Sequence, residues 1–101
     1  MSVFGFRLRC ARERLGWTQE ELGLAVGIDK SSSRARISRY ETGRSEPAFR
    51  ITQRLAKTLN VPIGYFYCED ELQAEMLLIL HRLPSDQFQR VVEVMRTYPL
   101  E

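Results

Sequence analysis

A capping motif and two glycines divide residues 18–43 into two short helical segments. Thr18 precedes apolar residues at helical spacing, and Glu21 follows three residues later, which is the capping box that satisfies free amides at a helix start. Gly27 and Gly43 each stand where a segment ends, and a left-handed glycine at such a position ends a helix and turns the chain. The spacing therefore predicts one helix from about Thr18 to Gly27 and a second that ends at Gly43.

The remaining apolar residues before residue 68 indicate three more helices. Residues 4–15 repeat at helical intervals, and although residues 4–10 also alternate as in a strand, good helix formers continue the pattern. Pro47 opens a fourth helix that Asn60 ends, and a short fifth helix follows it. We expect an all-α fold in which five helices close one core over residues 1–67.

Two further helices are expected in residues 68–101. The first is acidic and carries Met76–Leu80, whose apolar groups occupy more than one helical face; Pro84 separates it from a last amphipathic helix. A helix that is apolar nearly all round must be covered from two sides. These helices either only cover the five-helix core or also form a dimer interface, which we favour. The interface candidates are Leu77, Leu78, Leu80 and Val92.

The net charge of +2 is distributed unevenly along the chain. Residues 1–57 contain 12 Lys and Arg against 6 Asp and Glu, whereas residues 58–101 contain 3 against 7. Arginine supplies 13 of the 15 cations, and its planar guanidinium suits phosphates and guanine edges better than an ammonium group does. The basic part coincides with the two short helices, so we expect it to meet a polyanion.

These motifs resemble the helix-turn-helix family of phage repressors and Xre-type bacterial regulators. The likeness rests on the sequence TQEELG at residues 18–23, ISRYETG at residues 37–43 and the pair Glu46-Pro47, and it covers roughly residues 4–67. The resemblance implies a lambda-repressor-like domain that places its second short helix in the major groove of double-stranded DNA. It also implies a sequence-specific transcriptional regulator, most often a repressor.

The resemblance assigns a role to individual residues of this chain. Ile37 would be the core residue of the recognition helix, and an ion pair between Arg12 and Glu41 would fix that helix against the first one. The positions that contact base edges would be Arg34, Ala35, Arg36, Ser38 and Arg39. In the family Gln19 would contact a phosphate, and beside it we expect Thr18 and Arg44 to be further phosphate contacts.

One departure from the family concerns the joint between the two short helices. The family usually joins them through a turn of about 3–4 residues, whereas nine residues, 28–36, separate Gly27 from Ile37 here. The surplus lies in the segment Asp29 to Ser33. It forms either a longer loop or an added turn of the second helix, capped by one of the serines 31–33.

Two functions from different classes fit these features. A dimer would place two recognition helices about one DNA turn, roughly 34 Å, apart on an inverted-repeat operator. The alternative is the antitoxin of a toxin–antitoxin pair, in which the acidic C-terminal helices bind a basic toxin. An enzyme is not expected, because no nucleophile and base, phosphate loop or metal cluster occurs at a plausible spacing.

The same features bear on cofactors and location. Cys10 and Cys68 have no cysteine or histidine near them at metal-binding spacing, so we expect packing residues, no metal and no cofactor. No small-molecule effector is predicted. The longest apolar run, Met76–Leu80, is too short to span a bilayer, and residues 1–10 lack the apolar stretch of a signal peptide. We therefore expect a cytoplasmic protein without a membrane partner.

Overall fold

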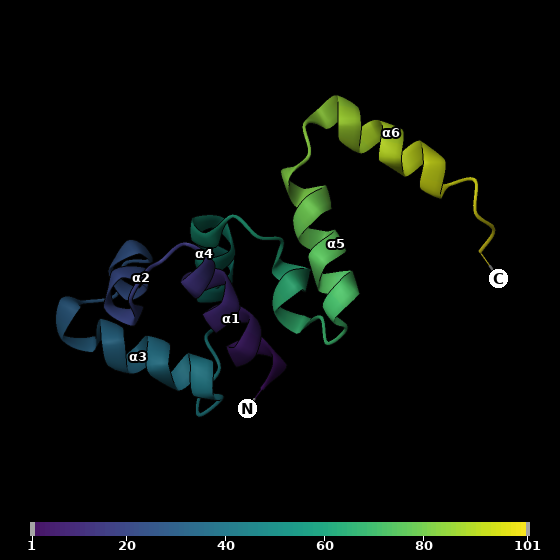
Figure 1. Cartoon of the computed structure of the whole chain (residues 1–101). Coiled ribbons are helices and arrows are strands. Elements are labelled where there is room, and N and C mark those ends of the chain that lie inside the picture. The colour runs from purple at the N-terminus through teal and green to yellow at the C-terminus, as the bar shows by residue number, and fades with distance from the viewer. Residues whose placement is uncertain (1, 101) are drawn as a thin grey trace.

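The computed structural model describes residues 2–100 and shows a helical chain. Figure 1 traces its elements from the N-terminus to the C-terminus. They are α1 (Val3–Arg14), α2 (Gln19–Ala25), α3 (Lys30–Thr42), α4 (Phe49–Leu59), the 3-10 helix η1 (Ile63–Tyr67), α5 (Glu71–Arg82) and α6 (Ser85–Met95). The described residues contain no strand, so the expected all-α class is confirmed.

Two boundaries differ from the expectation. Pro47 lies two residues before the start of α4 at Phe49 and is therefore not in its first turn. The short fifth helix is a 3-10 helix of five residues, whose tighter i→i+3 hydrogen bonding occurs mainly in short helical segments. Neither difference changes the order of the elements.

The ends of α2, α3 and α4 follow the signals in the sequence. Thr18 Oγ1 accepts a hydrogen bond from the Glu21 amide at 3.0 Å, and the Glu21 carboxylate accepts one from the Thr18 amide at 2.8 Å. These two bonds complete the capping box of α2. Gly43 has a φ of 79° and Asn60 a φ of 56°, the left-handed conformations that end α3 and α4.

The serine-rich insertion forms an added turn of α3 and not a longer loop. Because α3 begins at Lys30, only residues 26–29 separate it from α2. The expected capping by a serine is wrong. Asp29 occupies the cap position without a capping hydrogen bond from its side chain. Ser33 is fully buried, and its hydroxyl donates to the carbonyls of Ile28 and Asp29 at 3.0 and 2.9 Å.

One apolar core lies where α1, α2, α3, α4 and η1 meet. Each of these elements contributes at least one side chain with no exposed surface, namely Leu8, Leu22, Ile37, Leu55 and Phe66. Burying a side chain of this size stabilises a fold by about 1.5–3 kcal/mol. Ile37 is the contribution of α3, so the core itself determines which face of α3 points inward.

Two glycines let α3 approach its neighbours closely. A Cβ placed on Gly5 of α1 would collide with the carbonyl oxygen of Glu41 and would lie 2.8 Å from that of Tyr40. A Cβ placed on Gly23 of α2 would lie 2.5 Å from the Cβ of Ser33. Glycine is thus required where α1 meets the end of α3 and where α2 meets its start.

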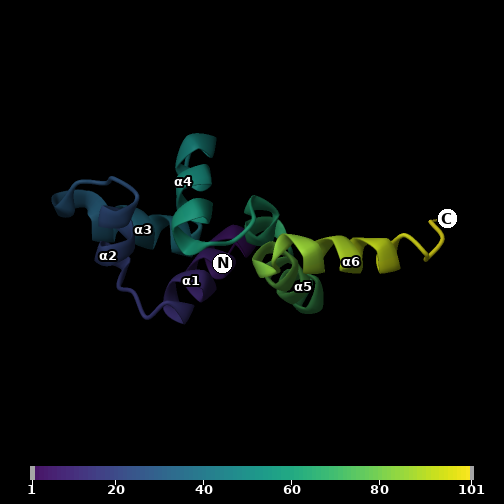
Figure 2. The same ribbon diagram turned by 90° about the horizontal axis from the view of Figure 1, so that it is seen from above.

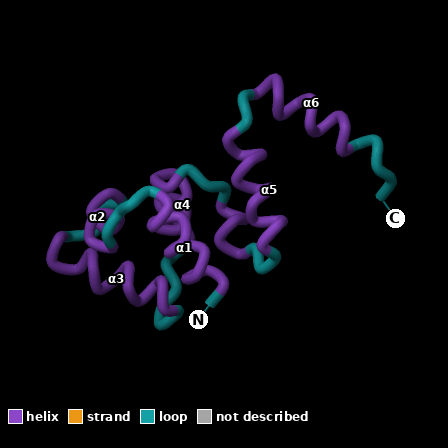
Figure 3. The backbone as a smooth tube through the Cα atoms, in the orientation of Figure 1, coloured by secondary structure: helices purple, strands orange, loops and turns teal. Residues whose placement is uncertain are grey.

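The elements α1, α2, α3, α4 and η1 form the body of the molecule, and α5 and α6 extend from this body as an arm (Figure 1). Figures 1 and 2 show α6 at the opposite end of the molecule from α2 and α3, and Figure 3 shows that a single loop joins α5 to α6. The molecule measures 51 × 26 × 23 Å, and its radius of gyration is 15.4 Å. A compact chain of about 100 residues would have a radius of gyration of about 13 Å. No residue of α6 is buried, so the arm leaves much of its surface open.

The packing of α5 corrects one residue of the expected dimer interface. Leu78 is buried with Ala74 in the core of its own chain, because these two residues form the face of α5 that contacts the body. Leu78 is therefore not available to a partner. The other three candidates, Leu77, Leu80 and Val92, remain half-buried.

Gly5→Ala is expected to destabilise the fold. Alanine normally favours a helix interior by roughly 1 kcal/mol over glycine. Here the added methyl group would push α1 away from the end of α3, and such overpacking costs about 1–3 kcal/mol. Urea denaturation followed by circular dichroism measures the change. Gly64→Ala is the matched control, because a Cβ at Gly64 meets no atom within 4 Å. A Gly5→Ala variant as stable as the wild type would contradict the close approach.

Candidate nucleic-acid interface

α3 has one face that is fixed against the body. Its buried residues recur at helical spacing and are Ser33, Ile37, Tyr40 and Glu41. The helix runs along one edge of the body, and in the view of Figure 1 no other helix lies below it. The remaining faces of α3 are therefore directed to the flanks of the body and to solvent.

The exposed part of α3 carries most of the residues expected to contact bases. Arg34, Ala35 and Arg39 are exposed, and Ser38 is half-buried. Neither Arg34 nor Arg39 forms an ion pair within residues 2–100, so both guanidinium groups can bind a partner. The added turn lengthens this face, because the exposed Ser31 lies one turn before Ala35. The place of Ser31 on this face was not expected, although its spacing of four from Ala35 in the sequence indicates it.

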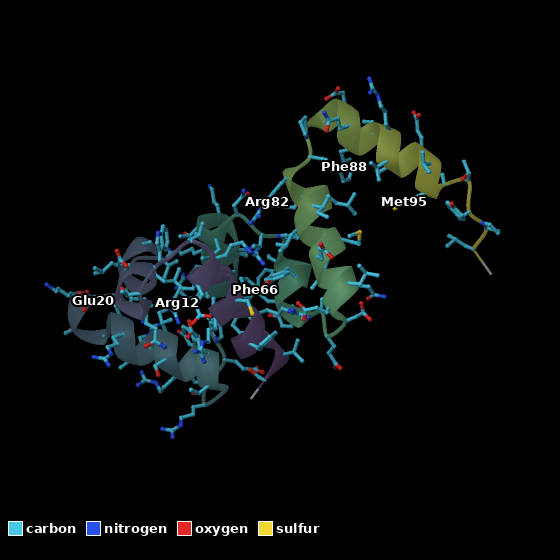
Figure 4. All side chains as sticks on the ribbon, viewed as in Figure 1. Arg12, Glu20, Phe66, Arg82, Phe88 and Met95 are labelled. Carbon is cyan, nitrogen blue, oxygen red and sulfur yellow. The ribbon has the colours of Figure 1, made fainter. Side chains whose placement is uncertain are left out.

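Arg34 also borders an open cleft between the start of α2 and α3. The cleft has a volume of about 600 Å³ and is lined by Arg12, Thr18, Gln19, Glu20 and Arg34. Figure 4 shows Glu20 on α2 at the outer edge of the body and Arg12 further in, towards α1. The cleft thus brings together one expected base contact and two expected phosphate contacts.

Arg36 is directed differently from Arg34 and Arg39. Its Nη2 donates a hydrogen bond to the Tyr40 hydroxyl at 2.9 Å, and its Cζ lies 6.0 Å from the centroid of the Tyr40 ring. Arg36 is also half-buried. In the free protein this side chain therefore packs on a flank of α3 and, unlike Arg34 and Arg39, is not fully exposed.

Arg12 and Glu41 form a nearly buried, bidentate ion pair. Arg12 Nε donates to Glu41 Oε2 at 2.6 Å, and Arg12 Nη2 donates to Glu41 Oε1 at 3.1 Å. The two side chains are 11% and 4% exposed. Arg12 Nη1 also donates to the carbonyl of Trp17 at 2.7 Å. This pair joins α1, the turn before α2 and the end of α3, so it fixes α3 relative to the rest of the body.

The three residues expected to contact phosphates differ in the hydrogen-bond donors that remain free for such a contact. The Gln19 amide donates to Glu41 Oε1 at 3.1 Å, which leaves its second N–H free. The Thr18 backbone amide is already bonded to Glu21, so only the hydroxyl hydrogen of Thr18 remains for a phosphate. Arg44 is exposed directly after α3. Gln19 and Arg44 are the better placed of the three.

The described residues show no other arrangement with an evident chemistry. Among residues 2–100, no group of three or more His, Cys, Asp and Glu side chains is placed to hold a metal ion. Both cysteines are free, and burial raises the pKa of the Cys10 thiol above its usual value. None of the helices in this part of the chain is long and apolar enough to cross a membrane.

Glu41→Ala is expected to lower the free energy of unfolding by about 3–5 kcal/mol, because it leaves the Arg12 guanidinium buried without its partner. Thermal or urea denaturation measures the loss. Glu13→Ala is the matched control: it removes the Arg9–Glu13 pair, whose two side chains are about half exposed, and should change stability little. Equal losses for the two variants would refute the structural role of the Arg12–Glu41 pair.

Comparison with known proteins gives a family model, two relatives and a solved structure that agree with this geometry. The helix-turn-helix family model matches residues 8–66. Two relatives, each described as an uncharacterized HTH-type transcriptional regulator, come from Sinorhizobium medicae (strain WSM419) and Rhizobium meliloti (strain 1021). Each is 35% identical over 63 residues, which are 62% of this chain and 42% of the relative. The matched part therefore spans less than half the length of these relatives.

A solved structure resembles nearly the whole chain. The crystal structure of the transcriptional regulator BswR superposes with a TM-score of 0.89 at 35% sequence identity, over 97% of this chain and 95% of that one. The likeness therefore includes the arm as well as the body. Since the family model covers more than half of the residues and α2 and α3 form the expected motif, this chain belongs to the helix-turn-helix family of phage repressors and Xre-type regulators, which is not a family of enzymes.

Proposed function

We propose that this chain is a sequence-specific, DNA-binding transcriptional regulator, which binds an inverted-repeat operator as a homodimer and represses transcription. The observation that carries the proposal is the orientation of α3. Its inner face is fixed by Ile37 and by the Arg12–Glu41 pair, while Arg34 and Arg39 are exposed and unpaired within the described residues. A helix held in this way can enter a major groove without rearrangement.

Two arginines would supply the sequence recognition. A bidentate arginine on the O6 and N7 of guanine discriminates against another base by about 1–3 kcal/mol. Arg39 lies on the exposed face of α3, and Arg34 lies on the flank that faces the start of α2. Ser38 and Ala35 lie between them and would contact neighbouring bases. Arg36 would join them only by giving up its hydrogen bond to Tyr40.

The phosphate contacts would set the register of the helix on the duplex. Gln19, at the start of α2, and Arg44, directly after α3, lie on either side of the exposed arginines in the sequence. Such contacts form with DNA of any sequence. Each one makes the binding constant fall by roughly 0.9 log units for every tenfold rise in salt concentration. The hydroxyl of Thr18 would add a weaker contact.

The arm would form the dimer interface by packing against the arm of a second copy of this chain. α6 carries an apolar stripe of four residues at helical spacing, Phe88, Val91, Val92 and Met95. Figure 4 shows Phe88 and Met95 on the same side of α6, the side that faces the open angle between α6 and α5. The outer face of α5 adds the exposed residues Leu72, Met76 and Ile79.

The charge of the arm supports its place away from DNA. Residues 58–101 carry 3 Lys and Arg against 7 Asp and Glu, so this end of the molecule would be repelled by phosphates. The arm also lies opposite α2 and α3 (Figure 2). An arm-to-arm dimer with Leu77, Leu80 and Val92 near its centre would leave both recognition helices free for successive major grooves on one side of the duplex. The antitoxin alternative is not favoured by the comparisons, since the matched proteins are described as transcriptional regulators.

Arg39→Ala is expected to weaken binding to an operator selected from random duplexes by about 1–3 kcal/mol, with a much smaller effect on unrelated DNA. Arg44→Ala, the matched control, should weaken binding to both duplexes. It should also lower the slope of log affinity against log salt concentration by about 1, the contribution of one phosphate contact. Fluorescence anisotropy over a salt series measures both effects. If Arg39→Ala lowers both affinities by the same factor, Arg39 does not contact bases.

Phe88→Glu is expected to shift the chain from dimer to monomer, because it places a charge in the apolar stripe of α6. Analytical ultracentrifugation at several concentrations measures the change. Gln89→Glu introduces the same charge at the neighbouring exposed position and should leave the dimer intact. A wild-type chain that sediments as a monomer at micromolar concentration would rule out the homodimer.

A further inference from the structure

Arg7 is a buried arginine that contacts the segment joining the body to the arm. It lies on α1, and its side chain is only 3% exposed. Its Nε donates to the carbonyl of Cys68 at 2.9 Å, and its Nη2 donates to the carbonyl of Glu69 at 3.1 Å. Its Nη1 donates to the Glu71 carboxylate at 3.1 Å. All three acceptors belong to residues 68–71, which lead from η1 into the first turn of α5.

Two aromatic rings hold the guanidinium group in place. The Cζ of Arg7 lies 5.3 Å from the centroid of the Phe6 ring and 5.7 Å from that of Tyr65. Contacts of this kind fix the plane of a guanidinium group, and a fixed plane also fixes the directions of its N–H donors. The carbonyls of Cys68 and Glu69 are thereby held at defined positions relative to α1.

The other contacts between α5 and the body are few. Only Ala74 and Leu78 of α5 are buried, and one exposed hydrogen bond of 3.4 Å joins Arg82 to the carbonyl of Asn60. α5 is about 18 Å long, so a tilt of about 10° at its first turn would move its far end by about 3 Å. That displacement is comparable with the rise of one base pair, about 3.4 Å.

We propose that Arg7 is a positioning residue that fixes the angle between the arm and the body and thereby determines the distance between the two half-sites of the operator. This proposal rests on the proposed function, since it needs an arm-to-arm dimer on DNA. Arg7 itself is too deeply buried to contact a phosphate. The two carbonyl bonds carry the effect, because the Glu71 side chain is 83% exposed and its ion pair is therefore weak.

Selection of bound duplexes from a random pool tests this role, with the wild type, Arg7→Lys and Arg7→Gln compared. Lysine keeps the charge but lacks the planar fork, and glutamine leaves no unpaired cation. Arg9→Lys, an exposed position on the same helix, and Glu71→Gln are the controls. Ultracentrifugation checks that each variant is a dimer, and circular dichroism checks that it is folded.

The wild type and both controls are expected to select one half-site separation. The Arg7 variants should select the same half-site sequence as dimers. Their preference for the wild-type separation over separations one or two base pairs longer or shorter should fall about tenfold, which is the worth of one hydrogen bond to a charged group. An unchanged preference in the Arg7 variants would overturn the role of Arg7. So would unfolding of both variants at 25 °C, because Arg7 would then support the whole fold. A wild type that selects single half-sites would instead refute the dimer of the proposed function.

Discussion

The bidentate ion pair between Arg12 and Glu41 is the contact on which the candidate interface depends. It joins α1 to the end of α3, and both partners have further bonds, from Arg12 to the Trp17 carbonyl and from Gln19 to the Glu41 carboxylate. A planar guanidinium on a carboxylate admits few relative orientations. A nearly buried pair adds little net stability compared with apolar residues of similar size, but it is costly to break. Its effect here is to hold the exposed face of α3 in one direction.

The added turn of α3 fixes the other end of the helix, its start, against the body. The turn between α2 and α3 keeps four residues, so the extra length lies in the helix. Ser33 extends the buried stripe by one turn from Ile37, and it fits only because Gly23 has no side chain. Contacts at both ends thus fix α3 along its length, and the insertion lengthens its exposed face by Ser31.

The sequence predicted the features that depend on neighbouring residues. Capping at Thr18 and the helix end at Asn60 follow from local spacing and backbone preference, and the buried position of Ile37 was expected from the family resemblance. Of the features that depend on distant residues, the Arg12–Glu41 pair was expected from the family resemblance alone, and others had no signal in the sequence. Arg7 finds its acceptors 61 and 62 residues further along the chain, and no local pattern indicates that contact. The burial of Leu78 against its own chain is likewise invisible in the sequence, because a helical pattern does not show which apolar face the same chain already covers.

NMR titration of the ¹⁵N-labelled chain with a short duplex at low ionic strength is the decisive test of whether α3 faces DNA, because it locates the contact surface without a known operator. We expect the largest amide shifts in the exposed part of α3, around Arg34 and Arg39, and at the start of α2, with little change in α6. Shifts concentrated in α4 or in the arm, or no shift with any duplex, would contradict the DNA-binding role of α3.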